Sequence, residues 1–164
     1  MRNFWKYCAI ALLTLSVFFA AGCDDDDNDD KAMSTTYSLE AINSSGVSGT
    51  VTFKKQNNTT TLVTIQLSGT QAGNSHPAHI HSGNVSTGGP VVLSFNPVEG
   101  STGKSETTVT KMDDGTLVKY EELIAFNGHV NIHLSVIELQ TMIAQGNIGA
   151  NSSGTGGSGN NGGY

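Results

Sequence analysis

Between Met33 and Ile148 the chain consists of short runs of alternating apolar and polar residues, separated by turns rich in Gly, Asn and Ser. Alternation with a period of two places the apolar side chains of a strand on one face and the polar ones on the other. The clearest run covers residues 59–68 and follows the turn signal Asn57-Asn58. The pattern predicts eight strands, at residues 37–42, 49–55, 60–67, 78–81, 91–95, 104–110, 128–134 and 143–148.

Two segments break the alternation and flank the seventh of these strands. Residues 120–126 predict one or two helical turns that end at Asn127-Gly128, and residues 135–138 have the spacing of a capping box. No run is long enough for a longer helix. The pattern is typical of an all-β protein, an antiparallel Greek-key or immunoglobulin-like β-sandwich or barrel of about eight strands with one or two short helical turns.

The first 22 residues have the layout of a secretory signal peptide. Arg2 and Lys6 form a basic start, an apolar run covers residues 8–20, and Ala21-Gly22 precede Cys23. A transmembrane anchor is the alternative, but about 14 apolar residues fall short of the ~20 that span a bilayer. Small residues before a cysteine resemble a bacterial lipoprotein signal, which implies that Cys23 is lipidated and that the chain contacts a membrane through this lipid anchor.

The remaining chain divides into three parts by composition. Residues 23–32 carry a run of aspartates that repels itself and predicts a solvated tether, residues 33–150 form one β domain, and residues 151–164 are a Gly/Ser/Asn tail typical of flexible coil. Acidic residues after a lipidated cysteine resemble surface-export signals of some lipoproteins, whereas aspartate beside the cysteine resembles a retention signal in others. We expect an outer-membrane, cell-surface protein, with the periplasmic side as the alternative.

Charge and cysteine content exclude several classes of function. The chain has 8 basic and 14 acidic side chains, a net charge of −6, which argues against a nucleic-acid partner. Its two cysteines are Cys8, which cleavage removes, and Cys23, so we expect no internal disulfide. No Gly-x-Ser-x-Gly elbow or phosphate-binding loop is present, which disfavours acyl- and phosphoryl-transfer enzymes.

All five histidines fall in two short clusters, at residues 76–81 and 129–133. In an extended strand His79 and His81 share one face, and in the second cluster His129 and His133 share a face with Asn131. If the two strands are neighbours, up to four imidazoles converge on a patch of sheet turned away from the core. Such a patch can bind a transition metal, with copper and zinc the ions that imidazole favours.

We expect the core ligands to be His79, His81 and His133, with His129 or His76 as the fourth. His76 and Asn131 are alternatively outer-shell partners that bond to the second ring nitrogen of a ligand. The competing interpretation is that these histidines bond to backbone groups or to one another and bind no ion. Their concentration in two clusters, with none elsewhere in the chain, favours the metal site.

Three ordered motifs resemble the CHRD (chordin-type) domain family: Ala-His-Ile-His-Ser-Gly at 78–83, Gly-Gly-Pro-Val-Val-Leu at 88–93 and Gly-His-Val-Asn-Ile-His at 128–133. The resemblance covers residues 37–148. It implies an immunoglobulin-like sandwich or barrel found in exported proteins, mostly without assigned activity. A lipid-anchored binding or structural module of the cell envelope, rather than an enzyme, is therefore the function that we expect, with adhesion or a matrix role as a variant.

The same motifs are similar to copper/zinc superoxide dismutase, in which a His-x-His strand and a later histidine hold copper; residues 144–149 are similar to the final strand of that family. This resemblance implies the alternative function, a copper-dependent redox enzyme. Three departures weigh against it. No histidine lies between His81 and His129, no cysteine is left for a disulfide, and the only arginine, Arg2, lies in the signal peptide, so no arginine is left to attract superoxide.

Overall fold

The computed structural model describes residues 33–152. The predicted signal peptide (1–22), Cys23, the acidic tether (23–32) and the tail from residue 153 onward lie outside the described residues. No helix among residues 33–152 combines the length and the apolar character that crossing a membrane requires.

The eight predicted strands are confirmed, each within three residues of its expected bounds. They are β1 (Ser34–Ala41), β2 (Ser48–Lys55), β3 (Thr61–Ser68), β5 (Ala78–Ser82), β6 (Val91–Ser94), β8 (Lys104–Val109), β9 (Asn127–His133) and β10 (Met142–Gly149). Two more strands, β4 (Ser75–His76) and β7 (Val98–Glu99), pair with each other and are two residues long. A strand of two residues is too short to produce an alternating pattern in the sequence.

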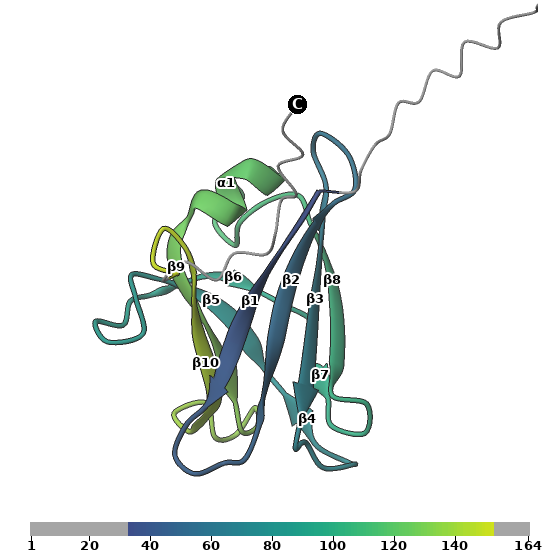
Figure 1. Cartoon of the computed structure of the whole chain (residues 1–164), viewed down its shortest axis with the longest axis vertical. Helices are drawn as coiled ribbons and strands as arrows, with labels where there is room; N and C mark the ends of the chain where they lie inside the picture. Colours follow the sequence, from purple (N-terminus) through teal and green to yellow (C-terminus); the bar gives the residue numbers. More distant parts are fainter. Residues whose placement is uncertain (1–32, 153–164) are drawn as a thin grey trace, which may run out of the picture.

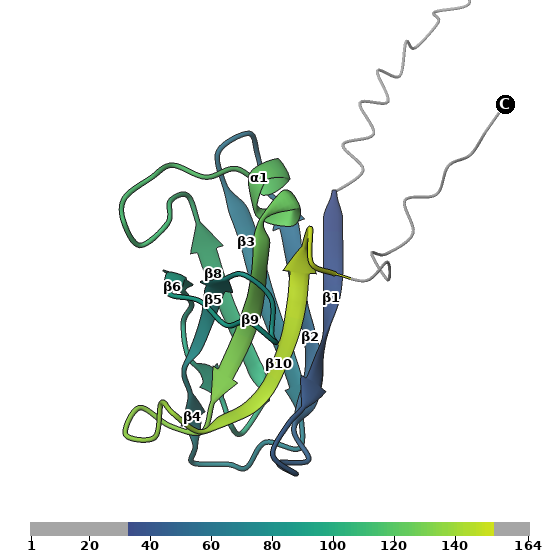
Figure 2. The same ribbon diagram turned by 90° about the vertical axis from the view of Figure 1, so that its left-hand side faces the viewer.

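The strands form one curled antiparallel sheet in the order β4-β7-β8-β3-β2-β1-β10-β9-β5-β6. The half from β4 to β1 faces the half from β10 to β6, so that the molecule has the two layers of a sandwich (Figure 1). Seen from the side, β9 and β10 form one wall, with β1 and β2 behind them (Figure 2). The all-β prediction is therefore confirmed, and the histidine strands β5 and β9 lie side by side in one layer.

The two halves are joined by a short seam between β1 and β10. Only Glu40↔Gln145 and Ala41↔Ala144 are paired across it. Beyond these pairs the backbones still approach closely, since a Cβ atom at Gly146 would lie 2.0 Å from the carbonyl oxygen of Ser38. Glycine is therefore the residue that this crossing of strands accepts.

Apolar side chains from both layers fill the space between them. Phe53 and Ile65 come from one layer, Ile80 and Ile132 from the other, and each is at most 1% exposed. Burying such a side chain stabilises the fold by about 1.5–3 kcal/mol. Because Ile80 and Ile132 alternate with histidines along β5 and β9, the core fixes which face of these strands the imidazoles occupy.

One helix, α1 (Tyr120–Ala125), forms where the sequence predicts it and lies over one end of the barrel (Figure 1). The carboxylate of Glu122 accepts a hydrogen bond from the backbone N–H of Lys119 at 2.7 Å, which caps the first turn. Leu123 is fully buried and anchors the helix to the core. The helix therefore closes this end of the space between the layers.

The capping-box prediction at residues 135–138 was wrong. This segment forms a turn in which the N–H of Glu138 donates to the carbonyl of Ser135 at 3.1 Å, and no helix follows. The reason is that Val136 and Ile137 are 68% and 89% exposed, so a helix here would have no apolar face to bury. Residues 134–141 are instead a loop that connects β9 to β10.

Candidate metal centre

The two histidine strands are direct neighbours. β5 pairs with β9 in antiparallel register, with His79 opposite Asn131 and His81 opposite His129. Ala78 and Ile80 point into the core on the other face. Cross-strand partners of this kind have side chains on the same face and within reach of each other. The sheet therefore places the side chains of these two pairs together on its outward face. His133 lies on the same face, two residues beyond Asn131 along β9.

Three imidazoles form a compact group within this patch. One ring nitrogen from each of His79, His81 and His133 lies within 4.8 Å of the other two. Nitrogens bound to one tetrahedral ion at about 2.0–2.1 Å lie about 3.3 Å apart, so small ring rotations bring the three onto one ion. The structure thus brings together the three predicted core ligands.

Four of the six ring nitrogens of this trio are buried and have no hydrogen-bond partner. Nδ1 of His79, Nε2 of His81 and both ring nitrogens of His133 are buried without a hydrogen-bond partner. A buried polar atom without a partner costs about 1–3 kcal/mol. Each such atom in a native structure calls for an explanation, and a bound ion is one of them. The donor set is suited to an ion that accepts nitrogen lone pairs.

Hydrogen bonds fix the tautomer of two of the rings. Nδ1–H of His81 donates to the carbonyl of Gly89 at 2.9 Å, which leaves the lone pair on Nε2, the unpartnered atom. His129 is held in the same way, since its Nδ1–H donates to the carbonyl of Gly83 at 3.0 Å. A backbone carbonyl that accepts from the distal ring nitrogen is the usual support of a metal-binding histidine.

The patch is more buried than the alternation predicted. His133 and Asn131 are each only 6% exposed, although they lie on the face turned away from the core. The loop that connects β9 to β10 covers this face, and its Leu139 and Gln140 line a cleft over the histidines. The cleft has a volume of about 300 Å³, and Val91 and Met142 complete its wall. The patch is therefore turned away from the core, as predicted, and lies beneath a loop that the alternation did not indicate.

Burial also favours the neutral form of two of these imidazoles, since it lowers the pKa of His79 and of His133. It lowers the pKa of His79, and the neighbouring His133 and His81 lower that pKa further, whereas Asp113 acts in the opposite direction. Burial likewise lowers the pKa of His133, and the nearby backbone of Leu139 acts in the opposite direction. The two do not form a hydrogen bond of normal geometry. A metal binds neutral imidazole, so the lowered pKa values of His79 and His133 favour the form that binds a metal.

The other predicted residues take different places. His129 lies outside the trio, with its ring stacked on that of His81 at a centroid distance of 5.2 Å. Asn131 lines the cleft, and its buried Oδ1 has no hydrogen-bond partner. The Nδ1–H of His76 donates to the carbonyls of Leu134 at 2.9 Å and His133 at 3.2 Å. The outer-shell alternative expected His76 to bond to the ring of a ligand histidine. In the structure it bonds instead to the backbone of His133 and of the next residue.

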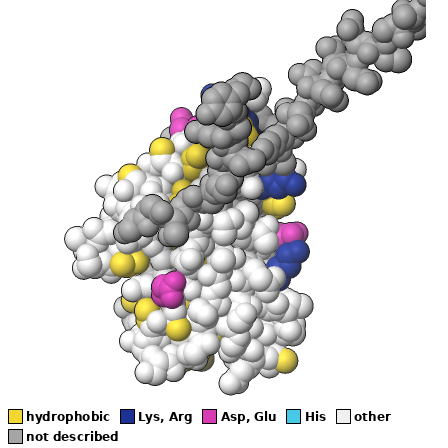
Figure 3. Space-filling model, in the orientation of Figure 1, with side chains coloured by type: hydrophobic (Ala, Val, Ile, Leu, Met, Phe, Trp, Pro, Cys, Tyr) yellow, Lys and Arg dark blue, Asp and Glu magenta, His cyan; other side chains and the backbone are white. Residues whose placement is uncertain are grey.

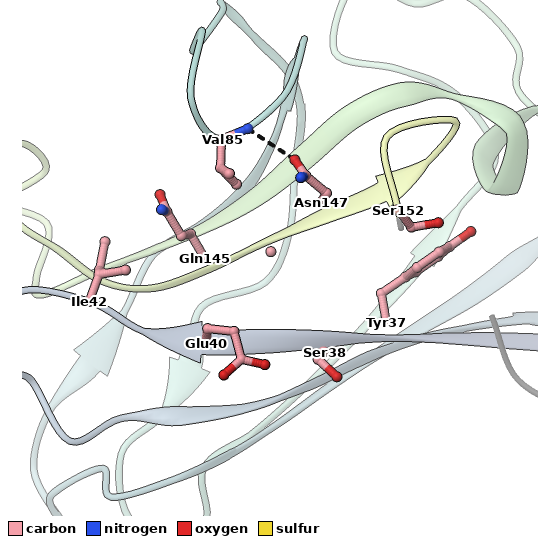
Figure 4. Close-up of a pocket in the computed structure, with 9 residues that line it drawn as sticks. Tyr37, Ser38, Glu40, Ile42, Val85, Gln145, Asn147 and Ser152 are labelled. Atoms are coloured by element: carbon pink, nitrogen blue, oxygen red, sulfur yellow. Dashed lines mark hydrogen bonds between the residues drawn. The ribbon is translucent and has the colours of Figure 1, made fainter. Parts of the chain in front are cut away.

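A second groove lies along the seam between β1 and β10 (Figure 4). It has a volume of about 280 Å³ and contains one carboxylate, that of Glu40, beside neutral polar side chains. Some of these are already engaged: Oδ1 of Asn147 accepts from the backbone N–H of Val85 at 3.0 Å, and Oγ of Ser152 donates to the carbonyl of Gly149. Few charged side chains are visible on the face that Figure 3 shows. The histidine cleft is thus the better metal centre.

Comparison with protein-family models matches residues 32–148 to the CHRD domain. The chain belongs to the CHRD domain family. The match extends from the residues before β1 almost to the end of β10, so the CHRD domain is the whole two-layered sheet described above. No curated protein matches the chain in sequence. In this CHRD domain the three family-like motifs lie on β5, on the segment leading into β6, and on β9, around the histidine cleft.

Sequence reasoning missed the supports of the site. The carbonyls of Gly83 and Gly89 orient two imidazoles, yet a backbone carbonyl leaves no mark in the residue pattern. The sequence gives one partial signal, because the Ser82-Gly83 pair marks a turn directly after the His-x-His strand. In the structure Gly83 has a positive φ of 75°, a conformation that glycine adopts readily. The covering loop gave no signal at all, since its fold depends on tertiary packing.

Proposed function

We propose that this protein is an exported, lipid-anchored module of the cell envelope whose CHRD domain binds one copper or zinc ion through His79, His81 and His133. The main support for the metal site is that one ring nitrogen from each of these three histidines lies within 4.8 Å of the other two. Each of the three rings also has at least one buried nitrogen without a hydrogen-bond partner. Three neutral imidazoles suit copper and zinc, whereas calcium and magnesium prefer oxygen ligands.

The arrangement supports binding more directly than catalysis. Three histidines leave a coordination position for a further ligand, as in zinc sites with three protein ligands. Among the residues that line the cleft in the described part of the chain, none carries a positive charge or a carboxylate that would guide an anion or act as a general base. We therefore propose a module that holds a metal and do not assign a reaction to it.

Direct metal analysis tests this function. The mature chain, purified without a histidine tag, is expected to bind one Cu or Zn ion per chain. Mutation of a residue that only supports a ligand lowers metal affinity by about 10- to 100-fold, and His133→Gln is expected to lower it by more than this. His129→Gln is the matched control, because His129 lies outside the trio and should retain most of the affinity. Less than about 0.1 ion per chain, with no binding tighter than ~1 mM, would contradict the proposal.

The membrane part of the proposal rests on the leader sequence. Ala21-Gly22-Cys23 follows a basic start and an apolar run, and an acidic segment separates it from the domain. Mass spectrometry of the mature N-terminus is expected to find a lipid-modified peptide that begins at Cys23. An unmodified N-terminus at another residue would contradict lipid anchoring and leave the metal site untouched.

A further inference from the structure

The cleft that contains the three imidazoles is also lined by a thioether side chain, that of Met142. Met142 is the first residue of β10, and its partner across the sheet is His133. Directly opposed residues of antiparallel strands have side chains on one face, with Cβ atoms about 4.5–5.5 Å apart. Met142 therefore lies beside His133 and lines the same cleft as the three imidazoles.

The backbone at Met142 departs from a regular strand. The register between β10 and β9 shifts between Met142 and Ala144, as in a β-bulge. Bulges re-aim side chains and are common next to functional sites. Met142 is half-buried and also borders the cavity beside His76, so its unbranched side chain can move between these two spaces by rotation about single bonds.

Resting on the metal site proposed above, we propose that the thioether of Met142 is the fourth ligand and makes the site selective for monovalent copper. Thioether sulfur is a soft donor that favours Cu(I), whereas zinc sites in proteins use thiolate, imidazole and carboxylate. The four ligands, three imidazoles and one thioether, are all neutral.

The charge and polarity of the cleft agree with a monovalent ion. With neutral ligands the bound site has the full charge of the ion, and the cost of burying a charge in a medium of low polarity rises with the square of that charge. Val91 and Leu139 line the cleft with apolar side chains. The carboxylate of Asp113, whose charge raises the pKa of His79, is not among the residues that line the cleft. A divalent ion would therefore lose more solvation here than Cu(I) does.

The test compares Met142→Leu with Met112→Leu, a matched control at a partly buried methionine that packs against the core elsewhere. The mature chain is titrated with Cu(I) under anaerobic conditions and with Zn(II), each against a competing chelator. We expect Met142→Leu to weaken Cu(I) binding by at least about 10-fold, since changes to outer-shell partners alone already cost about 10- to 100-fold. Zn(II) binding and the control variant should change less than about twofold.

Thermal unfolding of each metal-free variant verifies the fold, and leucine is close to methionine in volume. X-ray absorption of the Cu(I)-loaded wild type should show one sulfur neighbour that disappears in Met142→Leu. Equal Cu(I) affinity in Met142→Leu and wild type, or no sulfur neighbour in the wild type, would overturn the role of Met142 and leave the three-histidine site standing. Failure of the wild type to bind any of the ions would instead overturn the proposed function.

Discussion

Replacing His133 by leucine should stabilise the metal-free protein and abolish its stabilisation by metal. The imidazole of His133 is 6% exposed, and neither ring nitrogen has a hydrogen-bond partner. Leucine has a similar volume and no polar atoms. Removing this buried polar group should therefore recover about 1–3 kcal/mol of unfolding free energy.

The assay is thermal unfolding followed by circular dichroism, first with a chelator present and then with metal. A gain of about 2 kcal/mol corresponds to roughly 8 °C in Tm for a domain of this size. Metal at 100 times its Kd should stabilise the wild type by about 2.7 kcal/mol, and should not stabilise His133→Leu. His76→Leu provides a control, because His76 is 2% exposed and has one unpartnered ring nitrogen, Nε2, while its Nδ1–H donates to two backbone carbonyls.

The two variants separate a metal ligand from a structural histidine. His76→Leu should stabilise the metal-free protein less than His133→Leu does, because the gain from removing the buried, unpartnered Nε2 of His76 is offset by the loss of the donor to two carbonyls. If His133→Leu leaves the metal-free protein no more stable than His76→Leu does, His133 is structural and the reasoning is refuted. A metal-induced shift that survives in His133→Leu would refute it equally.

Two further predictions concern pH and the seam between the layers. Because folding lowers the pKa of His79, His129 and His133 below the ordinary 6.5, the unfolded chain binds more protons just below pH 6.5. The metal-free protein should therefore have its full stability above about pH 6.5 and lose stability as the pH falls below this value. The urea midpoint should be lower at pH 5.5 than at pH 7.5, and equal midpoints would contradict the lowered pKa values. Gly146→Ala should cost about 1–3 kcal/mol, because its Cβ would lie 2.0 Å from the carbonyl oxygen of Ser38, and an unchanged urea midpoint would show that the seam can widen freely.

The sequence predicts those parts of the fold that repeat over several residues. The strict alternation of residues 60–67 corresponds to β3, and the alternation around His79 and His133 places the core on one face of β5 and β9. Neither β4 nor β7 is long enough to show a period. The spacing at residues 135–138 indicated a helix because capping residues recur by chance, and a start signal without an apolar face does not produce one.

The three candidate histidine ligands were predictable from the sequence, whereas the surroundings of the site and Met142 were not. One His-x-His pattern, at His79 and His81, and one His-x-x-x-His pattern, at His129 and His133, are visible in the sequence, and strand geometry places each pair on one face. Burial beneath the β9–β10 loop and support from glycine carbonyls arise from tertiary contacts between distant segments. Met142 belongs to the same class, because a single methionine at the start of a strand is indistinguishable in the sequence from a core residue.

Diffraction from crystals of the metal-loaded protein at the absorption edge of the bound ion tests the central claim most directly. The account predicts one anomalous peak per chain, within about 2.0–2.1 Å of a ring nitrogen of each of His79, His81 and His133. A peak at another place, such as beside Glu40 in the seam groove, or no peak after loading, would contradict it.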